Sequence, residues 1–424
     1  MTHRVLVMGH GHPDVISGGG EIAAHNSWKA YSESDLVEKA WFLARSDVKH
    51  SGLSGAISGR LSRYRDNQYL WDQGLADPFM MRAANLNEVV GSFSELVRAL
   101  RPTLVHTHHY FMLGLEYLKV LKDINPEVKT VMTLHEYMAI CPNSGTMLNP
   151  ETKSLCQSGA YDHHFGCAPD RSPEDHWLRY NRFQTYFSYV DHFIAPSEFL
   201  RARYIEWGLT PDRISVVRNG VVPQKRLPPR TLEDQGTRNR FAFFGQINPM
   251  KGIDLVLRAL HAMTSKQRKR VHFEIHGANL ERQSEEFQNE FTDLLEPLVR
   301  EGVVTLVGPY AQSELPARMA GIDWVVVPGQ WFENAPLVIQ EAFSLGRPVI
   351  TSDLGGMREA VSDGITGFCL PRGSVPAWAE TMLRLAADTT QFDDCISNLP
   401  VPMTWDTSIA QTLALFSSHE VEPA

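Results

Sequence analysis

Short runs of β-branched and aromatic residues, each ending near Gly, His or Pro, alternate with segments of helical periodicity along most of the chain. Such runs are typical of buried strands, and their alternation with amphipathic helices predicts right-handed crossovers and parallel sheets. The pattern predicts strands at residues 5–8, 103–106, 130–135, 192–195, 214–217, 241–244, 272–276, 303–307, 324–327 and 348–351.

Two such series of strands lie on either side of a segment at 223–240 that is rich in Pro and charged residues, which is typical of an interdomain connection. We therefore expect an N-terminal Rossmann-like domain at 1–222 and a C-terminal one at 223–402. A last helix within 403–424 could cross back to the N-terminal domain. We expect two doubly wound α/β domains that face each other. Ligands would bind in the cleft between them, beyond the carboxyl ends of the strands.

Composition narrows the class of protein. With 43% hydrophobic and 10% aromatic residues the chain is not mostly disordered, and its net charge of −9 excludes a protein that coats nucleic acid. The first apolar run is too short for a signal peptide, and no run approaches the roughly 18 residues of a spanning helix. The five cysteines without tight spacing fit a reducing compartment. We expect a soluble, cytoplasmic protein.

The passage at 323–368 carries the strongest chemical signal. A strand and a loop through Glu333 lead into a predicted helix, whose free amides and dipole favour an anion. Glu341 lies among apolar residues of this helix, where a carboxylate is costly unless hydroxyls such as a ribose diol hydrogen-bond it. The alternative is a buried Glu paired with a distant Arg or Lys. The residues that begin the helix are Asn334, Ala335, Pro336 and Leu337, with Pro336 suited to a first helical position.

A second passage follows the strand at 241–244. Gly245 and Gln246 end the strand, and Lys251 lies just before a helix with apolar residues at i, i+3, i+4 and i+7. A cation at a helix N-terminus is unfavourable by up to about 1 kcal/mol, and a bound anion would reverse that sign. The alternative is a solvent-facing Lys.

Glycines and histidines follow the strands of the first series. Gly18, Gly19 and Gly20 would let the backbone approach a ligand closely, or would simply form a flexible loop. The order of residues at 9–14 departs from the dinucleotide fingerprint, which disfavours an NAD-dependent oxidoreductase. Residues at two strand ends could face a ligand or be structural, namely His106, His108, His109, His135 and Glu136.

Metal binding has weak support in the sequence. Cys141, Cys156 and Cys167 could hold zinc together with His163 and His164, but they lack the paired short spacings of structural zinc sites. The sequence contains no Asp-x-Asp pair, which argues against Mg²⁺ on a diphosphate. We therefore expect no metal and no cofactor, with positive charge supplied by Lys, Arg and helix ends.

Three further segments lack a clear chemical signal. Residues from Pro142 to about Arg179 have no periodicity and predict a long loop. The aromatic segment at 177–189 could lie on a bilayer, but packing in the core is the favoured interpretation. The basic run at 266–270 is expected at a solvated helix end.

Taken together, these motifs resemble glycosyltransferase family 4, the retaining nucleotide-sugar glycosyltransferases of the GT-B fold. The resemblance rests mainly on 245–252, 333–341, 346–350, Gly355 with Gly356, Glu359 and 363–367. The first half adds 18–21, 135–136, 195–198 and 218–221. Two departures stand out, because the family usually has Arg where this chain has Gln246, and commonly Gly where it has Pro336.

The resemblance implies a role for each matching residue. Glu333 would contact hydroxyls of the transferred sugar, Glu341 would hold the ribose, and Lys251 would neutralise the diphosphate. His135 would lie near the sugar on the acceptor side, so His135, Glu333 and Lys251 are the expected catalytic residues. The expected donor-binding residues are Gly18, Gly19, Gly20, Gly245, Gln246, Lys251, Asn334, Ala335, Pro336, Leu337 and Glu341. The expected acceptor-side residues are His108, His109 and Glu136.

The resemblance also implies the reaction: transfer of a hexose from a nucleotide-diphosphate sugar, with retention of configuration, to a glycan, a lipid-linked acceptor or a small molecule. Polysaccharide biosynthesis would be a typical setting. A lipid-linked acceptor would bring peripheral contact with the inner face of the membrane. Two alternatives remain at this point, a nucleotide-sugar 2-epimerase of the same fold and a non-enzymatic module that binds a metal or a partner through its Cys/His loop.

Overall fold

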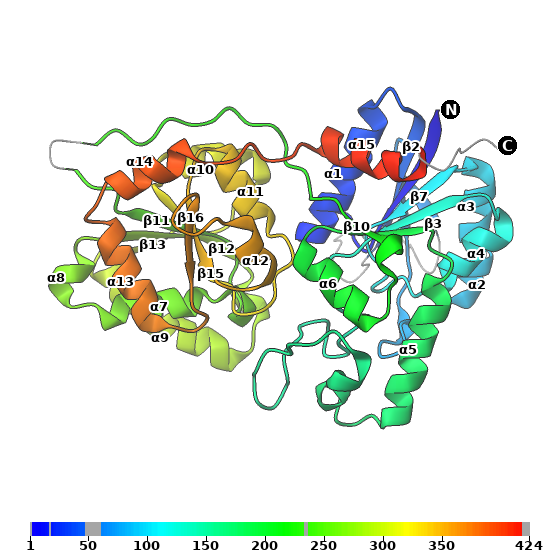
Figure 1. Ribbon diagram of the computed structural model, residues 1–424, viewed down its shortest axis with the longest axis horizontal. Coiled ribbons are helices and arrows are strands. Elements are labelled where there is room, and N and C mark those ends of the chain that lie inside the picture. The colour runs from blue at the N-terminus through cyan, green and yellow to red at the C-terminus, as the bar shows by residue number, and fades with distance from the viewer. Residues whose placement is uncertain (1, 17, 47–60, 233–235, 418–424) are drawn as a thin grey trace. The chain divides into compact units, whose positions relative to one another are not determined.

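The computed structural model describes residues 2–16, 18–46, 61–232 and 236–417 (Figure 1). The chain divides into two compact units, unit 1 comprising Met1–Gly220 with Met403–Ala424, and unit 2 comprising Val221–Pro402. Each unit is built on a largely parallel sheet flanked by helices, which confirms the predicted α/β class with two sheet domains.

Unit 1 contains β1 (His3–Gly9), β2 (Val37–Arg45), β3 (Leu61–Arg65), β4 (Gln68–Trp71), β5 (Leu75–Asp77), β6 (Arg82–Ala83), β7 (Leu104–Thr107), β8 (Lys129–Thr133), β9 (His192–Ala195) and β10 (Ile214–Val216). Its helices are α1 (Gly19–Glu33), α2 (Leu86–Val90), α3 (Ser92–Leu100), α4 (Glu116–Ile124), α5 (Pro173–Phe187), α6 (Glu198–Trp207) and α15 (Trp405–Ser417). Its described residues also form the 3₁₀ turns η1 (Tyr161–Cys167) and η2 (Pro211–Arg213).

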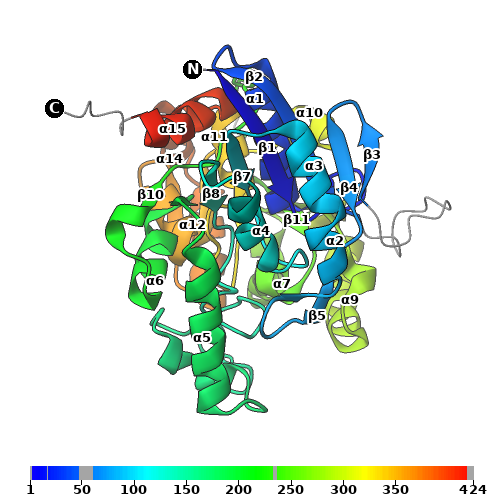
Figure 2. The ribbon, with the colours of Figure 1, turned by 90° about the vertical axis from the view of Figure 1, so that its right-hand side faces the viewer.

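The main sheet of unit 1 has the order β10-β9-β8-β7-β1-β2-β4-β3 over the described residues, with β10 and β3 at opposite edges (Figure 2). All neighbours pair in parallel except β3 and β4. The chain builds outward from β1 in one direction through β2, then returns to β7 on the other side of β1. Because crossovers are right-handed, this reversal sends the helices after β1 and β7 to opposite faces of the sheet.

The C-terminal helix belongs to unit 1. α15 packs along α1, as Figure 1 also shows, and buries Ile409 and Leu413. Ser408 Oγ donates a hydrogen bond to the carbonyl of Arg218, at 3.0 Å. Helix α15 therefore closes the chain onto the unit in which it begins. Residues 418–424 of the predicted C-terminal segment lie outside the described residues.

Unit 2 contains β11 (Arg240–Gln246), β12 (His272–Ala278), β13 (Val304–Leu306), β14 (Trp324–Val327), β15 (Val349–Ser352) and β16 (Gly367–Leu370). Its helices are α7 (Ile253–Ala262), α8 (Ser265–Arg268), α9 (Glu285–Arg300), α10 (Leu315–Ala320), α11 (Leu337–Ser344), α12 (Gly355–Ala360), α13 (Val375–Leu385) and α14 (Thr390–Ser397). The 3₁₀ turns are η3 (Pro249–Lys251), η4 (Leu280–Arg282) and η5 (Gln312–Glu314).

The sheet of unit 2 has the order β13-β12-β11-β14-β15-β16 over the described residues, and every neighbouring pair is parallel. This is the doubly wound 3-2-1-4-5-6 order, which reverses between β11 and β14. Alternate residues of β11 enter two separate cores. Phe241 and Phe243 pack with α7, α9, α13 and α14, whereas Ala242 and Phe244 pack with α10, α11 and α12. The sheet is thus buried on both faces, which explains its near-continuous apolar strands.

The segment before β11 is held against unit 2 by buried charges. The Asp323 carboxylate is fully buried and accepts hydrogen bonds from Arg230 at 2.8 Å, from Arg238 at 3.4 Å and from the backbone N–H of Arg240 at 3.0 Å. The buried Arg347 guanidinium donates to the carbonyls of Leu227 and Pro228. The segment predicted as an interdomain connection therefore contributes to the packing of unit 2.

All ten predicted strands are present, but two predictions about other segments need correction. The long loop predicted up to about Arg179 ends earlier, because α5 begins at Pro173 behind a capping box between Ser172 and Asp175. Several strands were missed, among them β2, whose first residues are charged and exposed, and β16, which begins at a glycine. Gly367 has φ +158°, and a Cβ there would lie 1.8 Å from the Val349 carbonyl oxygen.

The aromatic segment at 177–189 is divided between core and solvent. Phe183 and Phe187 are buried in unit 1, whereas Trp177 and Leu178 are about half exposed, at 53% and 51%. None of the helices in the described parts of the chain combines the length and the apolar character needed to cross a membrane.

We predict that Asp323→Ala destabilises unit 2 by about 3–5 kcal/mol, because it leaves two arginines without their buried counter-charge. Urea denaturation followed by circular dichroism measures this change. The matched control is Asp353→Ala, which removes an exposed pair with Arg358 at 3.0 Å and should cost less than about 1 kcal/mol. Equal losses for the two variants would contradict the structural role of Asp323.

Candidate functional site

The predicted site residues of unit 2 gather at its topological switch point. Loops after β11 and β14 run to helices on opposite faces of the sheet, and the edge between them is where doubly wound folds bind ligands. Lys251 comes from the first loop and Glu333 from the second. Lys251 Nζ lies 2.6 Å from Glu333 Oε1, and their side chains are 32% and 8% exposed. The structure thus joins two predicted catalytic residues into one ion pair.

A glycine brings these two loops together. Gly252 has φ +68° and is the residue before α7, and a Cβ there would lie 2.1 Å from the carbonyl oxygen of Pro328. The backbone N–H of Gln330 also donates to the Met250 carbonyl, at 2.8 Å. Any side chain at position 252 would push the loops apart, so the Lys251–Glu333 contact depends on this glycine.

Helix α12 braces the loop that carries Glu333. The N–H of Gly356 donates to the Glu333 carbonyl at 2.9 Å, and a Cβ at Gly356 would lie 1.5 Å from the Asn334 carbonyl oxygen. Asn334 itself is buried. Glycine at this position lets the helix meet the loop backbone directly, which fixes where the Glu333 carboxylate points.

Helix α11 begins one residue later than predicted. Leu337 is its first residue, and Pro336 is the N-cap with φ −59° and ψ 116°, so Pro336 precedes the first helical position rather than occupying it. Within the described part of the chain, no side chain caps this helix. Its first amides and its dipole therefore retain the character of an anion site, with Ala335 leading into it.

Glu341 lies half-buried one turn into α11. Gln312 Nε2 donates a hydrogen bond to its Oε1 at 2.5 Å, and burial raises the pKa of this carboxyl. Among the described residues, no Arg or Lys forms an ion pair with Glu341. Glu341 is therefore hydrogen-bonded to a neutral amide, and the alternative of a pair with a distant Arg or Lys is not found among the described residues.

The surroundings of Glu341 include residues that the sequence analysis did not single out. Burial, with the charge of Glu341, raises the pKa of the Tyr310 hydroxyl. The Tyr310 ring packs edge-on against Phe244, 5.7 Å between centroids, and Phe244 stacks on His276 at 4.4 Å. These side chains come from β11, β12 and the segment after β13, which are distant in sequence, so periodicity could not have grouped them.

Gly245 and Gln246 close strand β11 at the same edge of the sheet. They pair with Gly277 and Ala278 of β12. Gly245 has φ +152°, and its hypothetical Cβ would meet only the Phe243 ring, at 3.5 Å. Both predicted donor-binding residues are half-buried beside the loop that leads to Lys251.

Unit 1 has its own switch point, between β1 and β7. His10 Nε2, just after β1, lies 2.9 Å from Oε1 of the buried Glu21 in α1. Burial acts to raise the pKa of Glu21, but the hydrogen bond and charge of His10 outweigh it, so the pKa is lowered. The His10 ring also packs against the His109 ring, 4.4 Å between centroids.

The glycine triplet lies at the start of α1. A Cβ on Gly18 would lie 2.6 Å from Glu21 Oε2, whereas Gly19 has open space and Gly20 meets only the His10 ring, at 3.6 Å. The carboxylate of Glu21 thus lies at the helix N-terminus, beside the glycines that were expected to bind the donor. A negative group of the chain itself occupies the favourable end of this helix dipole.

The histidines predicted at the acceptor side lie in a cluster of rings, of which His108 and His109 are buried and His135 is half-buried. His108 Nδ1 lies 3.0 Å from His135 Nε2, and the His106 ring stacks on His108 at 4.2 Å. Burial lowers the pKa of His135 to about 4 and that of His106 to about 3, and it lowers those of His108 and His109 well below the usual value. These imidazoles are neutral at pH 7. His106 also contacts Tyr31 and Thr133, which is a structural role.

Glu136 is buried behind His109. Burial raises the pKa of its carboxyl to about 7, and the backbone N–H of Met138 donates to it. Its Oε1 lies 3.8 Å from His109 Nε2, beyond a hydrogen bond. The neighbouring loop is held by Arg179, which donates to the Ala139 carbonyl at 2.6 Å. Arg179 is a positioning residue that the sequence analysis missed, because its partner carbonyls are about 40 residues away.

Two family models match the chain. The model for glycosyl transferases group 1 matches residues 227–399, and the model for glycosyltransferase family 4 matches residues 53–225. Their boundary falls close to that between the two structural units.

Curated relatives resemble parts of the chain. D-inositol 3-phosphate glycosyltransferase of Kribbella flavida is 29% identical over 195 residues, 43% of this chain and 45% of the relative. Lipopolysaccharide 1,2-N-acetylglucosaminetransferase of Salmonella typhimurium is 31% identical over 186 residues, 42% of this chain and 48% of the relative. The aligned part of the chain spans about half the length of these relatives.

Solved structures resemble nearly the whole chain. HepE (Alr3699) of Anabaena, in complex with UDP and glucose, has a TM-score of 0.63 at 18% identity, covering 98% of this chain and 99% of that one. Sucrose-phosphate synthase (tll1590) of Thermosynechococcus elongatus has a TM-score of 0.68 at 15% identity, covering 97% and 98%. At these identities the likeness concerns the fold, which is GT-B. With both family models and this fold, the chain belongs to the family-4 glycosyltransferases of the GT-B class.

Proposed function

We propose that the protein transfers a sugar from a nucleotide-diphosphate sugar to an acceptor with retention of configuration. The observation that carries this proposal is the Lys251–Glu333 pair at the switch point of unit 2, with Glu341 on the following helix. The two matching family models and the relatives that this chain resembles support the same activity.

Lys251 would neutralise the diphosphate leaving group. Its ammonium is half-exposed, precedes the N-terminus of α7 and is balanced here by Glu333. A diphosphate carries more negative charge than one carboxylate and would attract both the ammonium and the helix dipole. As the bond to the sugar breaks, this positive end stabilises the charge that develops on the leaving phosphate.

Glu333 would then bind the transferred sugar. Once Lys251 turns to the diphosphate, the Glu333 carboxylate needs other hydrogen-bond donors, because a buried charge without partners is costly. Sugar hydroxyls supply such donors. The ion pair in the free protein would therefore hold both groups in place until the donor separates them.

Glu341 and its neighbours would bind the nucleoside. The carboxylate can accept hydrogen bonds from the two ribose hydroxyls in place of Gln312, and the Tyr310–Phe244–His276 rings offer an aromatic surface for the base. The donors to test first carry UDP, because HepE of Anabaena was solved with UDP and with UDP-glucose.

The histidine cluster of unit 1 would serve the acceptor side. Neutral imidazoles such as His135, His108 and His109 can accept hydrogen bonds from sugar hydroxyls, and Glu136 lies behind them. We propose a same-face mechanism, in which the departing phosphate takes the proton of the acceptor hydroxyl as the new glycosidic bond forms. In our proposal this step needs no metal ion, because Lys251 and the helix N-termini supply the positive charge.

The acceptor is proposed to be a glycan or a lipid-linked glycan in polysaccharide assembly. The two relatives act, by their names, on an inositol phosphate and on lipopolysaccharide, which are both polar, hydroxyl-rich acceptors. For a lipid-linked acceptor the protein would work in the cytoplasm at the inner face of the membrane. The half-exposed Trp177 and Leu178 of α5 are suited to such peripheral contact.

A donor screen tests the proposal. Thermal shift is measured with UDP-, GDP-, ADP- and TDP-sugars, because a ligand at 100 times its Kd adds about 2.7 kcal/mol of stability. The product is then analysed with and without acceptor sugars. A raised melting temperature with one class of donor and an acceptor-dependent glycoside are the expected results. A C2-epimerised sugar formed without acceptor would instead identify the epimerase alternative.

We predict that Lys251→Ala lowers kcat more than 10-fold, or by over about 1.4 kcal/mol of activation free energy, because the leaving group loses its cation. Steady-state kinetics at saturating donor measure the effect. Lys266→Ala is the matched control. This lysine is exposed on α8, which precedes the amino end of β12, whereas Lys251 follows the carboxyl end of β11. Near wild-type turnover in Lys251→Ala would refute the role of this ammonium.

We predict that Glu341→Ala raises the dissociation constant of the nucleoside diphosphate about 10- to 100-fold, because hydrogen bonds to a charged group contribute roughly 1.5–3 kcal/mol. Isothermal titration with the diphosphate identified by the screen measures it, and kcat should fall less than affinity. Gln340→Ala on the same helix serves as the control. An unchanged affinity in the Glu341 variant would assign the ribose to another part of the protein.

A further inference from the structure

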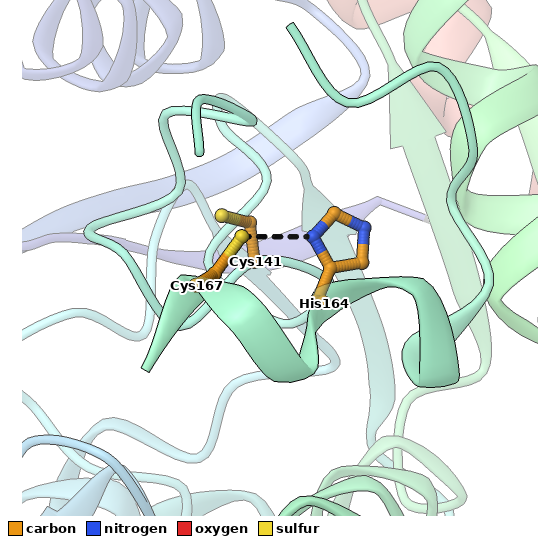
Figure 3. Close-up of side chains that lie close together, drawn as sticks. All are labelled: Cys141, His164 and Cys167. Atoms are coloured by element: carbon orange, nitrogen blue, oxygen red, sulfur yellow. Dashed lines mark hydrogen bonds between the residues drawn. The ribbon is translucent and has the colours of Figure 1, made fainter. Parts of the chain in front are cut away.

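Three cysteines and one histidine of unit 1 converge in the segment at 141–167. The sulfurs of Cys141 and Cys167 and a ring nitrogen of His164 all lie within 4.8 Å of one another, and Figure 3 shows the three side chains close together, with the His164 ring facing the Cys167 sulfur. Cys156 Sγ lies 3.9 Å from Cys167 Sγ, although it is not within 4.8 Å of all three of these atoms. We propose that Cys141, Cys156, His164 and Cys167 bind a zinc ion in a structural site of Cys₃His type.

Two of the distances between the ligand atoms match the edges of a zinc tetrahedron. With Zn–S near 2.3 Å and Zn–N near 2.0–2.1 Å, the edges of the tetrahedron are about 3.8 Å between two sulfurs and about 3.6 Å between sulfur and nitrogen. The structure has 3.9 Å between Cys156 Sγ and Cys167 Sγ, and 3.6 Å between Cys167 Sγ and His164 Nδ1. A disulfide would need about 2.0 Å, and all these cysteines are free.

The histidine is oriented as a metal ligand. His164 is fully buried, and its Nε2 lies 3.0 Å from the Ser158 carbonyl, to which an Nε2–H donates. This hydrogen bond fixes the tautomer that leaves the lone pair on Nδ1, the atom facing the sulfurs. A backbone carbonyl behind a zinc-bound histidine is a recurrent second partner in such sites. His163, the neighbouring candidate, is instead exposed and pairs with Asp162.

The local backbone explains how distant ligands meet. η1 is a 3₁₀ helix, in which residues i and i+3 lie on the same side, so His164 and Cys167 project together. The N–H of Cys156 donates to the Met147 carbonyl at 2.7 Å, and that of Cys141 to the Tyr137 carbonyl at 2.7 Å. These hydrogen bonds and the 3₁₀ helix fix the backbone at Cys141, at Cys156 and at His164 with Cys167.

The segment buries few apolar side chains. Within residues 142–172, all of which the structure describes, the buried apolar side chains other than cysteine are Met147 and Leu148. Regular structure there is limited to η1 and an isolated bridge between Leu148 and Leu155. A metal cross-link would stabilise such a loop-rich segment, and four protein ligands with no open position are typical of structural zinc.

The site would stabilise the loop that carries the predicted acceptor residues. Cys141 follows His135 and Glu136 by a few residues, and Arg179 binds carbonyls of the turn between them. This inference is independent of the proposed reaction, because it concerns the ligand set alone. It is an alternative to the expectation of no metal.

Metal analysis of the full chain tests the inference. We predict about one zinc per chain by plasma mass spectrometry after extensive dialysis, and a several-fold lower content in Cys156→Ser and in His164→Ala. Cys156 is half-buried, so its substitution perturbs packing least. The matched control is Cys369→Ser, a half-buried cysteine of unit 2, which should retain the metal. Zinc absent from the wild type, or unchanged in Cys156→Ser, overturns the site.

Cobalt exchange gives a readout that folding defects do not mimic. Co²⁺ bound to thiolates in a tetrahedral site gives an intense charge-transfer band in the near ultraviolet, and we expect Cys156→Ser to lose about one third of its intensity while Cys369→Ser keeps it. Mass spectrometry of the non-reduced, alkylated protein completes the test. A disulfide between Cys156 and Cys167 in the purified wild type contradicts the proposal, whereas free thiols blocked from alkylation until a chelator is added support it.

Discussion

Parallel pairing is the constraint on which both candidate sites depend. Strands that run in the same direction end at the same edge, and the reversals of strand order at β1/β7 and β11/β14 send neighbouring loops to opposite faces there. Residues far apart in the sequence, such as Lys251 and Glu333, thereby reach the same place. A glycine is also required. The backbone at position 252 lies against the Pro328 carbonyl of the other loop, and any side chain there would clash with this carbonyl.

Each switch point carries a buried carboxylate that already has a partner from the protein. Glu333 is paired with Lys251, and Glu21 with His10. A carboxylate away from water needs such a partner, and a donor ligand must offer better ones to separate the pair. In unit 1 the Glu21 carboxylate also takes the place beside Gly18 that a phosphate could occupy. The free protein thus balances internally the charges that we assign to substrate binding.

The Cys/His cluster would stabilise the long segment at 142–172, which buries few apolar side chains. Directional bonds from one ion can substitute for the apolar burial that residues 142–172 lack. The neighbouring turn at 138–139 is held by the Arg179 guanidinium instead, through hydrogen bonds to carbonyls. Together these two devices fix the backbone beside the buried histidines, where small shifts would alter ring contacts.

The sequence by itself determined the strand positions, the two α/β series and the family, because apolar runs, loop glycines and residues such as Lys251, Glu333 and Glu341 stand at fixed spacings within continuous segments. Strands β2 and β16 were not predicted. One begins with charged residues and the other with a glycine, and their burial comes from neighbouring strands rather than from their own apolar pattern. Tertiary structure alone decided that Lys251 pairs with Glu333, that Gln312 and Tyr310 adjoin Glu341, and that Cys156 joins Cys167 and His164. Such contacts are distances in space between separate loops, and periodicity along one segment carries no information about them.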